Sequence, residues 1–368
     1  MSALRVLDFG SVSPVMSLAI WHGVADAMGA ADDPVMTLSN PDAPFICVGF
    51  HQDVAQEVDA AWCAAQRMPV IRREAGGGAV LLDAPHLFVH FIYPRRLANG
   101  RAATLYPRFI APLVETYRSL GVAARYRALN DIHVDDRKIG GSAIASIGEA
   151  VVFAGMILFD FDAERMARAL RVPSEKFRDK LRTSLGDYIT SLRRELDTPP
   201  PRERVVEVLL SHLPRTLDAD PQASEAREDE RLAIERRAAS LLDPDWTHKA
   251  GRRAIADGVK LMAGAALVEA DWKAPGGLLR FRALARNGVL VDLDLAGDFT
   301  CLPIDGPTRL ASALRGSRLD LPDLPARIDH HIATLGLDMP GVGGGDLAAA
   351  LIGAIPEWAA RAPLAPSP

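Results

Sequence analysis

Three apolar segments separated by short turns lie in the middle of the chain, and they constrain the fold more than any other feature. The segments 131–134, 138–145 and 151–161 are rich in apolar residues, and Asp135-Asp136 and Ile147-Gly148-Glu149 separate them. Turns this short join antiparallel neighbours, because a parallel pair of strands needs a long crossover. The sequence therefore predicts an antiparallel meander at the centre of the fold.

Helices and further strands are predicted on both sides of this meander from apolar periodicity and flanking turn residues. Helices are expected at 16–28, 54–66, 105–120, 163–170, 174–180, 201–212, 308–314, 324–334 and 345–355. Strands are expected at 45–48, 70–71, 87–93, 278–285 and 289–295, with Asn287-Gly288 as the hairpin turn between the last two. The fold class that follows is α+β.

The length of the chain indicates two domains. The 368 residues exceed what one core usually organises. The stretch 215–238 is rich in Asp, Glu, Arg and Ala, and indicates either a solvated helix or a mobile connector. We expect a large domain at 1–250, with a charged connector near 215–250, and a smaller α+β domain at 258–362. Residues 363–368 are expected to form a disordered tail.

Composition excludes several classes of protein. A net charge of -5 argues against a basic nucleic-acid-binding protein. No apolar run approaches the ~20 residues of a membrane span, and the N-terminus does not resemble a signal peptide. Cys47, Cys63 and Cys301 are too scattered for a disulfide framework. We therefore expect a reduced, cytoplasmic protein without a nucleic-acid or membrane partner.

The first motif that carries chemistry spans residues 72–80. Arg72 and Arg73 leave a predicted strand, and three consecutive glycines follow at 76–78. Glycines let backbone N–H groups approach an anion closely, and arginine forks suit phosphate or carboxylate groups. The motif therefore indicates anion binding. Taken alone, it is equally compatible with a glycine-rich bend that carries surface arginines.

The second motif combines Asn130-Asp131 with Lys138, which lies in a predicted strand just before Gly140-Gly141. The glycines leave space above the neighbouring backbone, into which a lysine side chain can reach. A lysine in such a space can hold a carboxylate and offset charge on a transferring phosphorus. Taken alone, a solvent-facing hairpin lysine is the better interpretation.

Together, in this order and spacing, the two motifs resemble those of the lipoate–protein ligase family. The resemblance extends to the segments 47–59, 179–192 and 297–299, and it is weakest between 200 and 260. It implies a catalytic domain of the biotin ligase and class II synthetase type, followed by an accessory C-terminal domain. It also implies that lipoate attacks ATP to form lipoyl-AMP, and that a lysine of a lipoyl domain or glycine-cleavage H-like carrier then accepts the lipoyl group.

The resemblance also implies roles for individual residues. Lys138 and Asp131 are the implied catalytic residues, and Asp131 is a candidate ligand for Mg²⁺ at the ATP phosphates. Strands around 87–91 and 152–158 are a positional guess for the slot of the lipoyl tail. The residues implied in ATP and substrate binding are Arg72, Arg73, Gly76, Gly77, Gly78, Ala79, Val80, Asn130, Lys138, Gly141 and Ala143.

The chain departs from the family pattern at a few positions near the implied pocket. Ala75 stands where a serine is usual, Leu82 where a histidine is frequent, and Ala154 and Met156 replace a histidine and a threonine. Each change removes a polar group. These departures affect the expected acyl-chain preference and rate more than the anion chemistry.

Two rival functions follow from the same residues. An octanoyl or lipoyl amidotransferase of this fold needs a nucleophilic cysteine shortly before the lysine motif, and the segment 126–130 contains none. A non-catalytic lipoate-binding partner subunit would explain the lost polar groups, but not the retained Arg72 and Lys138.

Three other residues are expected to have structural roles. His133 is expected at the surface beside the hairpin turn. Asp346 is expected to cap a helix that begins at Leu347, and Trp246 to pack at the domain junction.

Overall fold

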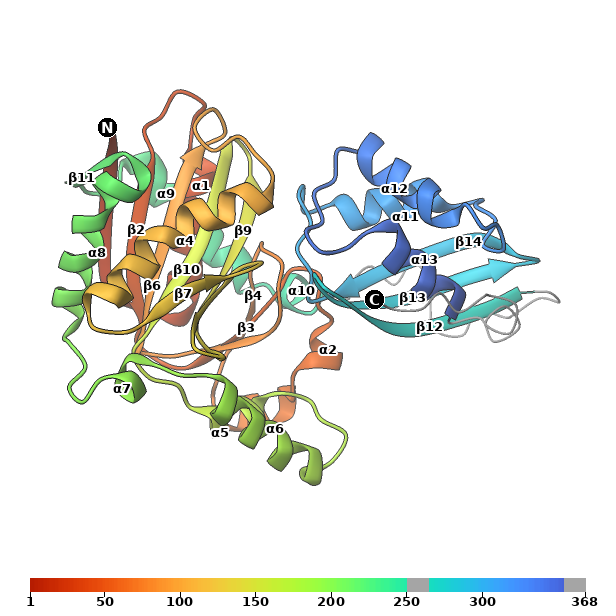
Figure 1. Cartoon of the computed structure of the whole chain (residues 1–368), viewed down its shortest axis with the longest axis horizontal. Coiled ribbons are helices and arrows are strands. Elements are labelled where there is room, and N and C mark those ends of the chain that lie inside the picture. Colours follow the sequence, from red (N-terminus) through yellow and green to blue (C-terminus); the bar gives the residue numbers. More distant parts are fainter. Residues whose placement is uncertain (250–264, 354–368) are drawn as a thin grey trace. The chain divides into compact units, whose positions relative to one another are not determined.

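The computed structural model describes residues 1–249 and 265–353, drawn in colour in Figure 1. The chain forms two compact units, which are described separately below. The first comprises Met1–Gly49, Val54–Ala75 and Ala79–His248, and the second comprises Phe50–Asp53, Gly76–Gly78 and the chain from Lys249 onward. The predicted residues 258–264 and 354–368 lie outside the described part of the chain.

A large mixed sheet forms the centre of the first unit (Figure 1). The predicted meander is confirmed, because β8, β9 and β10 are antiparallel neighbours. β6 pairs antiparallel with β10 on one side and with β2 on the other, whereas β1 pairs in parallel with β2 and with β11. In spatial order the strands are β11 (Ala219–Ala223), β1 (Ser2–Val12), β2 (Val35–Pro41), β6 (His86–Pro94), β10 (Ala150–Leu158), β9 (Arg137–Ile147), β8 (Asp131–Val134) and β7 (Ala124–Arg127).

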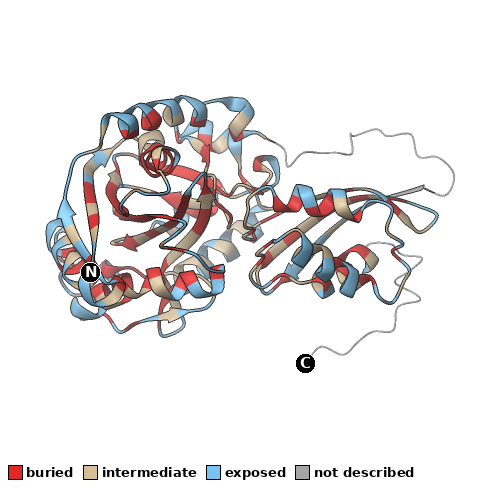
Figure 2. Cartoon of the chain, turned by 90° about the horizontal axis from the view of Figure 1, so that it is seen from above, coloured by how far each residue is buried: buried red, intermediate tan, exposed pale blue. Residues whose placement is uncertain are grey.

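Helices cover both faces of this sheet and bury its side chains, as the red positions in Figure 2 show. On one face, Trp21 of α1 (Pro14–Ala27) lies in a core with Phe88 and Val152. On the other face, Phe109 of α4 (Ala102–Ser119) stacks on Phe91 at 5.8 Å, and α4 packs beside α8 (Arg202–Leu217). Alternate residues along β6 and β10 therefore serve two different cores.

The charged connector contains a helix that is exposed along one side, as expected for a solvated helix, and its other side packs against the first unit, which corrects the alternative of a mobile connector. β11 extends the large sheet, and α9 (Glu228–Leu241) lies against α1. The helices approach so closely that a Cβ at Gly23 would stand 2.4 Å from the backbone nitrogen of Ile234. The buried side of α9 contains only three apolar residues, Ala233, Ile234 and Leu241, beside the charged Glu230, which is why composition alone suggested solvation.

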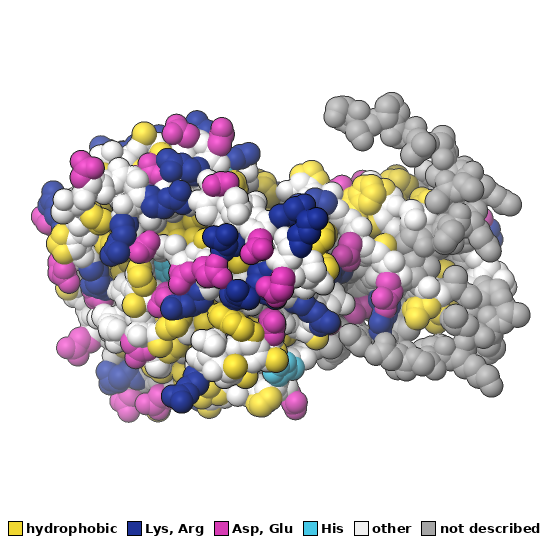
Figure 3. Space-filling view, turned by 90° about the horizontal axis from the view of Figure 1, so that it is seen from below, with side chains coloured by type: hydrophobic (Ala, Val, Ile, Leu, Met, Phe, Trp, Pro, Cys, Tyr) yellow, Lys and Arg dark blue, Asp and Glu magenta, His cyan; other side chains and the backbone are white. Residues whose placement is uncertain are grey.

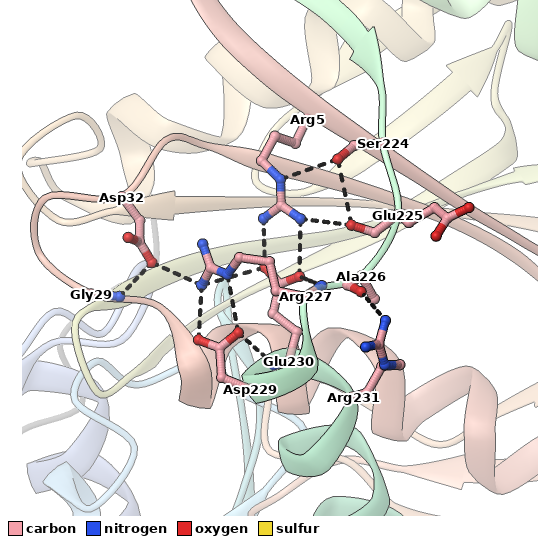
Figure 4. A network of polar contacts seen from close by, with 10 residues as sticks. All are labelled: Arg5, Gly29, Asp32, Ser224, Glu225, Ala226, Arg227, Asp229, Glu230 and Arg231. Atoms are coloured by element: carbon pink, nitrogen blue, oxygen red, sulfur yellow. Dashed lines mark hydrogen bonds and ion pairs between the residues drawn. The ribbon is translucent and has the colours of Figure 1, made fainter.

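A polar network fastens the start of α9 to β1 (Figure 4). Glu230 is 1% exposed and accepts from the Arg5 guanidinium at 2.6 Å, and its other oxygen accepts from the backbone N–H of Arg227. The Arg227 side chain reaches Asp32 at 3.1 Å. A buried carboxylate is tolerated here because it is both ion-paired and hydrogen-bonded.

A second, smaller sheet contains both ends of the motif at 72–80, since Arg72 ends β4 and Val80 begins β5. The predicted strands at 45–48 and 70–71 are confirmed as β3 (Phe45–Val48) and β4 (Val70–Arg72), which run parallel. β5 (Val80–Leu82) pairs antiparallel with β3. The helix expected at 54–66 is split, because Asp59 caps a second helix by accepting from the N–H of Trp62. Its two parts are α2 (Val54–Glu57) and α3 (Ala60–Ala65).

Four further helices complete the described part of the first unit: α5 (Ala163–Ala169), α6 (Glu175–Tyr188), α7 (Leu192–Glu195) and α10 (Pro244–Thr247). On the face drawn in Figure 3, basic and acidic side chains are interspersed over this unit. Ion pairs such as Arg165–Asp83, at 2.8 Å, have the same mixed character. Within the described residues, no helix has the length and hydropathy that crossing a membrane requires.

Within its described residues, the second unit contains a three-stranded antiparallel sheet and three helices around one core. Asn287 and Gly288 both have positive φ, at 48° and 80°, which confirms the predicted hairpin turn. The expected helix start at Leu347 is wrong by three residues, because the helix begins at Gly344 and Asp346 accepts from the N–H of Gly343. The elements are β12 (Ala265–Ala274), β13 (Gly277–Arg286), β14 (Val289–Gly297), α11 (Gly306–Leu314), α12 (Leu324–Thr334) and α13 (Gly344–Gly353).

Candidate active site

Lys138 and Asp131, the two residues expected to be catalytic, form an ion pair in the first unit. Lys138 Nζ lies 2.7 Å from Asp131 Oδ1, and the two side chains are 32% and 21% exposed. Asp131 pairs with Gly141 across β8 and β9. A Cβ at Gly141 would lie 3.0 Å from both Cε and Nζ of Lys138, so this glycine provides the space that the lysine occupies. The pair is therefore fixed in place yet open to solvent on one side.

The remaining residues expected around Lys138 lie on β9 or, for Asn130, in the turn directly before β8. The side-chain amide of Asn130 donates to the carbonyl oxygen of Ser142, and Ser142 Oγ donates back to the carbonyl of Asn130. This reciprocal contact holds the start of β8 against β9. Gly141 and Ala143 are partly exposed although they lie inside the sheet. Because the side chain of Ala143 is small, the surface of the sheet beside Lys138 is accessible.

His133 is completely buried, so the expected surface position is wrong. Its ring lies between Arg127 Nη1, at 3.3 Å from Nδ1, and the Tyr188 hydroxyl, at 3.5 Å from Nε2. The helix α6 that carries Tyr188 was too polar to suggest that it covers a strand. Burial lowers the pKa of His133, and the neighbouring Asp131 carboxylate opposes that shift. The neutral ring packs behind the Lys138–Asp131 pair.

Arg72 is fully buried and hydrogen-bonded within the first unit, and its expected contact with phosphate stays a prediction. Its side chain is 0% exposed. The guanidinium donates to the carbonyls of Gly49 at 2.8 Å, Thr247 at 2.9 Å and Trp246 at 3.1 Å. The indole Nε1 of Trp246 donates in return to the carbonyl of Arg72 at 3.0 Å. Arg72 thus joins the end of β4 to α10, and Trp246 packs on this arginine.

Arg73 differs from Arg72 in both burial and contacts. It is partly exposed, and its guanidinium reaches the carbonyl of Cys47 at 3.3 Å. Because its side chain is partly exposed, Arg73 is more accessible to an anionic ligand than Arg72, which is fully buried.

Two side chains outside the predicted motifs, His22 and Arg237, contact Glu74, the residue after Arg73. The N–H of Glu74 donates to His22 Nε2 at 2.9 Å, and His22 Nδ1 lies 2.7 Å from the carbonyl of Leu18. Burial lowers the pKa of His22 well below its usual value, so the ring is neutral and donates from Nδ1. The Glu74 carboxylate accepts from Arg237 of α9 at 2.7 Å. Only the histidine inside an apolar helix pattern could have hinted at this arrangement.

The three glycines, Gly76 to Gly78, belong to the second unit and are described within it. A Cβ at Gly76 would lie 2.5 Å from the carbonyl oxygen of Phe299, and Gly77 has a φ of +90°. The N–H of Gly77 donates to the same carbonyl at 3.3 Å. Glycine is thus required for close approach at one position and for backbone conformation at the next. The anion-binding role expected for these residues, and for Ala79 and Val80, stays a prediction.

The fold combines a mixed sheet covered by helices with a smaller α+β unit, and known proteins share it. The family profile for the lipoyl protein ligase A/B catalytic domain matches residues 13–214. The match spans more than half of the chain, which therefore belongs to this family.

Similar curated proteins carry two kinds of name. An octanoyltransferase LipM of Kyrpidia tusciae is 27% identical over 275 residues, which are 68% of this chain and 100% of that protein. Lipoate–protein ligase 1 of Staphylococcus aureus is 28% identical over 233 residues, 63% of this chain and 64% of that ligase. The family thus includes both ligases and acyltransferases at comparable distance from this chain.

Solved structures share the fold at low sequence identity. The bi-partite lipoate protein ligase of Thermoplasma acidophilum, described with its E2 lipoyl domain, has a TM-score of 0.63 at 23% identity and covers 70% of this chain and 100% of that one. A lipoate-protein ligase A bound with ATP has a TM-score of 0.59 at 21% identity, with 68% and 100% covered. These likenesses show the fold expected from the sequence.

Proposed function

We propose that the protein is an ATP-dependent lipoate–protein ligase. In the first step, a carboxylate oxygen of lipoate attacks the α-phosphorus of ATP, and the bond to the departing pyrophosphate breaks. In the second step, the amine of a carrier lysine attacks the acyl carbon, AMP leaves, and the amine loses a proton. The observation that carries the proposal is the Lys138–Asp131 pair, a positioned and solvent-accessible cation on the family's catalytic domain.

Lys138 supplies the charge that this chemistry needs. Negative charge grows on the phosphate oxygens as the carboxylate attacks, and a cation held beforehand stabilises that charge without reorganising. Asp131 holds the ammonium group by an ion pair, and the lack of a side chain at Gly141 leaves the space that the group occupies. Lys138 would therefore bridge the lipoate carboxylate and the α-phosphate, while Arg73 binds the phosphates further along the nucleotide.

The magnesium ion would be held mainly by the nucleotide. The described residues include no group of three His, Cys, Asp or Glu side chains that could hold a metal ion. Mg²⁺ commonly binds through one or two carboxylates together with substrate phosphates and water. This pattern fits Asp131 as the protein ligand. The ion would supply further charge neutralisation at the phosphates.

The cysteines favour the ligase over the transferase. A transferase needs a thiolate. Burial raises the pKa of Cys63 to about 11 and that of Cys301 to about 12, which disfavours a thiolate at either position. Cys47 is 1% exposed, although Arg73 Nη1 lies 3.5 Å from its sulfur. Cys47 is therefore the cysteine to test for the transferase alternative.

The acceptor would be a lipoyl domain or a glycine-cleavage H-like protein. Support comes from the Thermoplasma ligase, whose structure is described together with its E2 lipoyl domain. A carrier lysine must reach the acyl carbon beside Lys138, and the partial exposure of this pair permits that approach.

Two acyl donors separate the candidate functions. The full-length protein is incubated with an apo-lipoyl domain and either lipoate plus Mg-ATP or an octanoyl-carrier thioester, and the mass of the domain is followed. A ligase modifies the domain only with ATP and continues to do so as Cys47→Ser. Modification from the thioester without ATP, lost in Cys47→Ser, would show a transferase. Lipoate binding without modification under either condition would indicate a partner subunit.

A further inference from the structure

One row of residues crosses four strands of the large sheet on the face that α1 covers. Thr37 of β2 pairs with His90 of β6, His90 pairs with Ala154 of β10, and Ala154 pairs with Ala143 of β9. Residues directly opposite one another in paired strands point to the same face. Gly141, two residues before Ala143, therefore shares this face, and Lys138 lies over it. The row connects the proposed catalytic lysine with His90.

The middle of the row consists of small, partly exposed side chains, whereas His90, toward its far end, is buried. Ala143 and Ala154 are partly exposed, although each lies in an interior strand. His90 is 4% exposed, and Trp21 of α1 stacks on its ring at 5.7 Å. Strand spacing and rise place Gly141 and His90 roughly 12 Å apart, comparable with an extended medium-length acyl chain. A chain whose carboxylate meets Lys138 would thus end near His90.

His90 has a polar atom available for a ligand at this closed end. Thr37 Oγ1 lies 3.0 Å from Nδ1, and no other described residue has a hydrogen bond to the ring. Burial lowers the pKa of His90 to about 3, so the imidazole is neutral and Nε2 retains one hydrogen-bonding group. Ala154, where the family pattern has a histidine, leaves room beside this ring.

We propose that His90 is a specificity-determining residue that binds the far end of the acyl chain and favours a sulfur-bearing end over a saturated one. The inference rests on the proposed acyl substrate. A dithiolane offers weakly accepting sulfurs to the imidazole and polarisable contacts to Trp21 and Phe88. A plain octanoyl end would leave the polar atom of His90 without a partner. The chain should therefore prefer lipoate to octanoate.

The test compares the binding of the two acids to full-length protein by calorimetry. Wild type should bind lipoate about two- to tenfold more tightly than octanoate, and His90→Phe should abolish that ratio while retaining octanoate binding. Thr37→Val, which frees the imidazole from its orienting contact, should reduce the ratio partially. Phe91→Leu is the matched control: Phe91 is the next residue of β6 but packs on Phe109 on the opposite face, so the ratio should not change.

The outcomes separate this inference from the proposed function. An unchanged lipoate-to-octanoate ratio in folded His90→Phe overturns the role of His90, even if the protein ligates lipoate. A ratio that depends on His90 supports it, even if the protein lacks ligase activity and only binds the acid. Failure of wild type to bind either acid overturns the inference. If His90→Phe does not fold, Thr37→Val decides, and an unchanged ratio in that variant overturns the inference.

Discussion

At the scale of single residues, the placement of Lys138 depends on the absence of a side chain at Gly141. Gly141→Ala would put a methyl group 3.0 Å from the lysine Cε and Nζ, and the lysine must move. We expect a loss of at least about tenfold in lipoate-dependent pyrophosphate exchange, because misplaced charge stabilises the transition state poorly. Gly345→Ala, with no atom within 4 Å of its added Cβ, is the control. Full exchange activity in Gly141→Ala would show that the observed lysine position is unimportant.

The two adjacent arginines should separate stability from activity. Arg72→Met removes three hydrogen bonds to buried carbonyls, and we expect the free energy of unfolding to fall by roughly 3 kcal/mol. Arg73→Met should change stability by less than about 1 kcal/mol and weaken the binding of ATP. Urea unfolding and nucleotide titration measure the two effects. Equal losses of stability in both variants would contradict the distinction.

From the burial of His86, we predict that the free energy of unfolding decreases as the pH falls. Burial lowers the pKa of His86 to about 4, so the folded state resists protonation that the unfolded chain accepts near its usual pKa. The stabilisation is therefore complete above about pH 6.5 and is lost progressively as the pH falls toward 4. By pH 5 this histidine alone should cost about 2 kcal/mol. His86→Gln should flatten the dependence of the urea midpoint on pH, and an identical slope in both proteins would refute the assignment.

At the scale of elements, helices and strands with a strong local sequence pattern are predicted correctly, and those with a weak pattern are not. The meander and the helix at 105–120 have clear periodicity and tight turns, and both exist. β11 reads Ala-Asp-Pro-Gln-Ala and was missed, because proline usually excludes a strand and is tolerated here only at the sheet edge. The packing of α9 is not predicted, because it depends on a close approach to Gly23 of α1, which is distant along the chain.

The contact between α1 and α9 gives a direct test of this packing. Gly23→Ala would force a methyl group into the backbone at Ile234, and we expect a loss of about 1–3 kcal/mol in the free energy of unfolding. Gly29→Ala meets its nearest atom, on Asp32, at 3.7 Å and should have little effect. Chemical denaturation compares the two. A neutral Gly23→Ala would mean that α9 does not lie against α1.

At the scale of the whole molecule, the candidate site could be predicted only where its residues are neighbours along the chain. Asp131 and Lys138 lie on one hairpin, so their spacing was enough to expect them together. The side chain of Arg72 contacts Gly49, 23 residues away along the chain, and Thr247 of α10, 175 residues away. No local sequence pattern predicts such contacts. His90 was missed because its importance depends on the strands beside it.

Ligase activity that depends on Lys138 is the central claim of the proposed function. The deciding measurement is lipoate-dependent ATP–pyrophosphate exchange by the full-length protein, with Lys138→Ala beside it. We expect exchange in the wild type and a reduction of about 10²–10³-fold in the variant, since a preorganised transition-state contact is removed. Undiminished exchange in Lys138→Ala, or no exchange by folded wild type with lipoate or octanoate, would contradict an adenylate-forming ligase centred on this lysine.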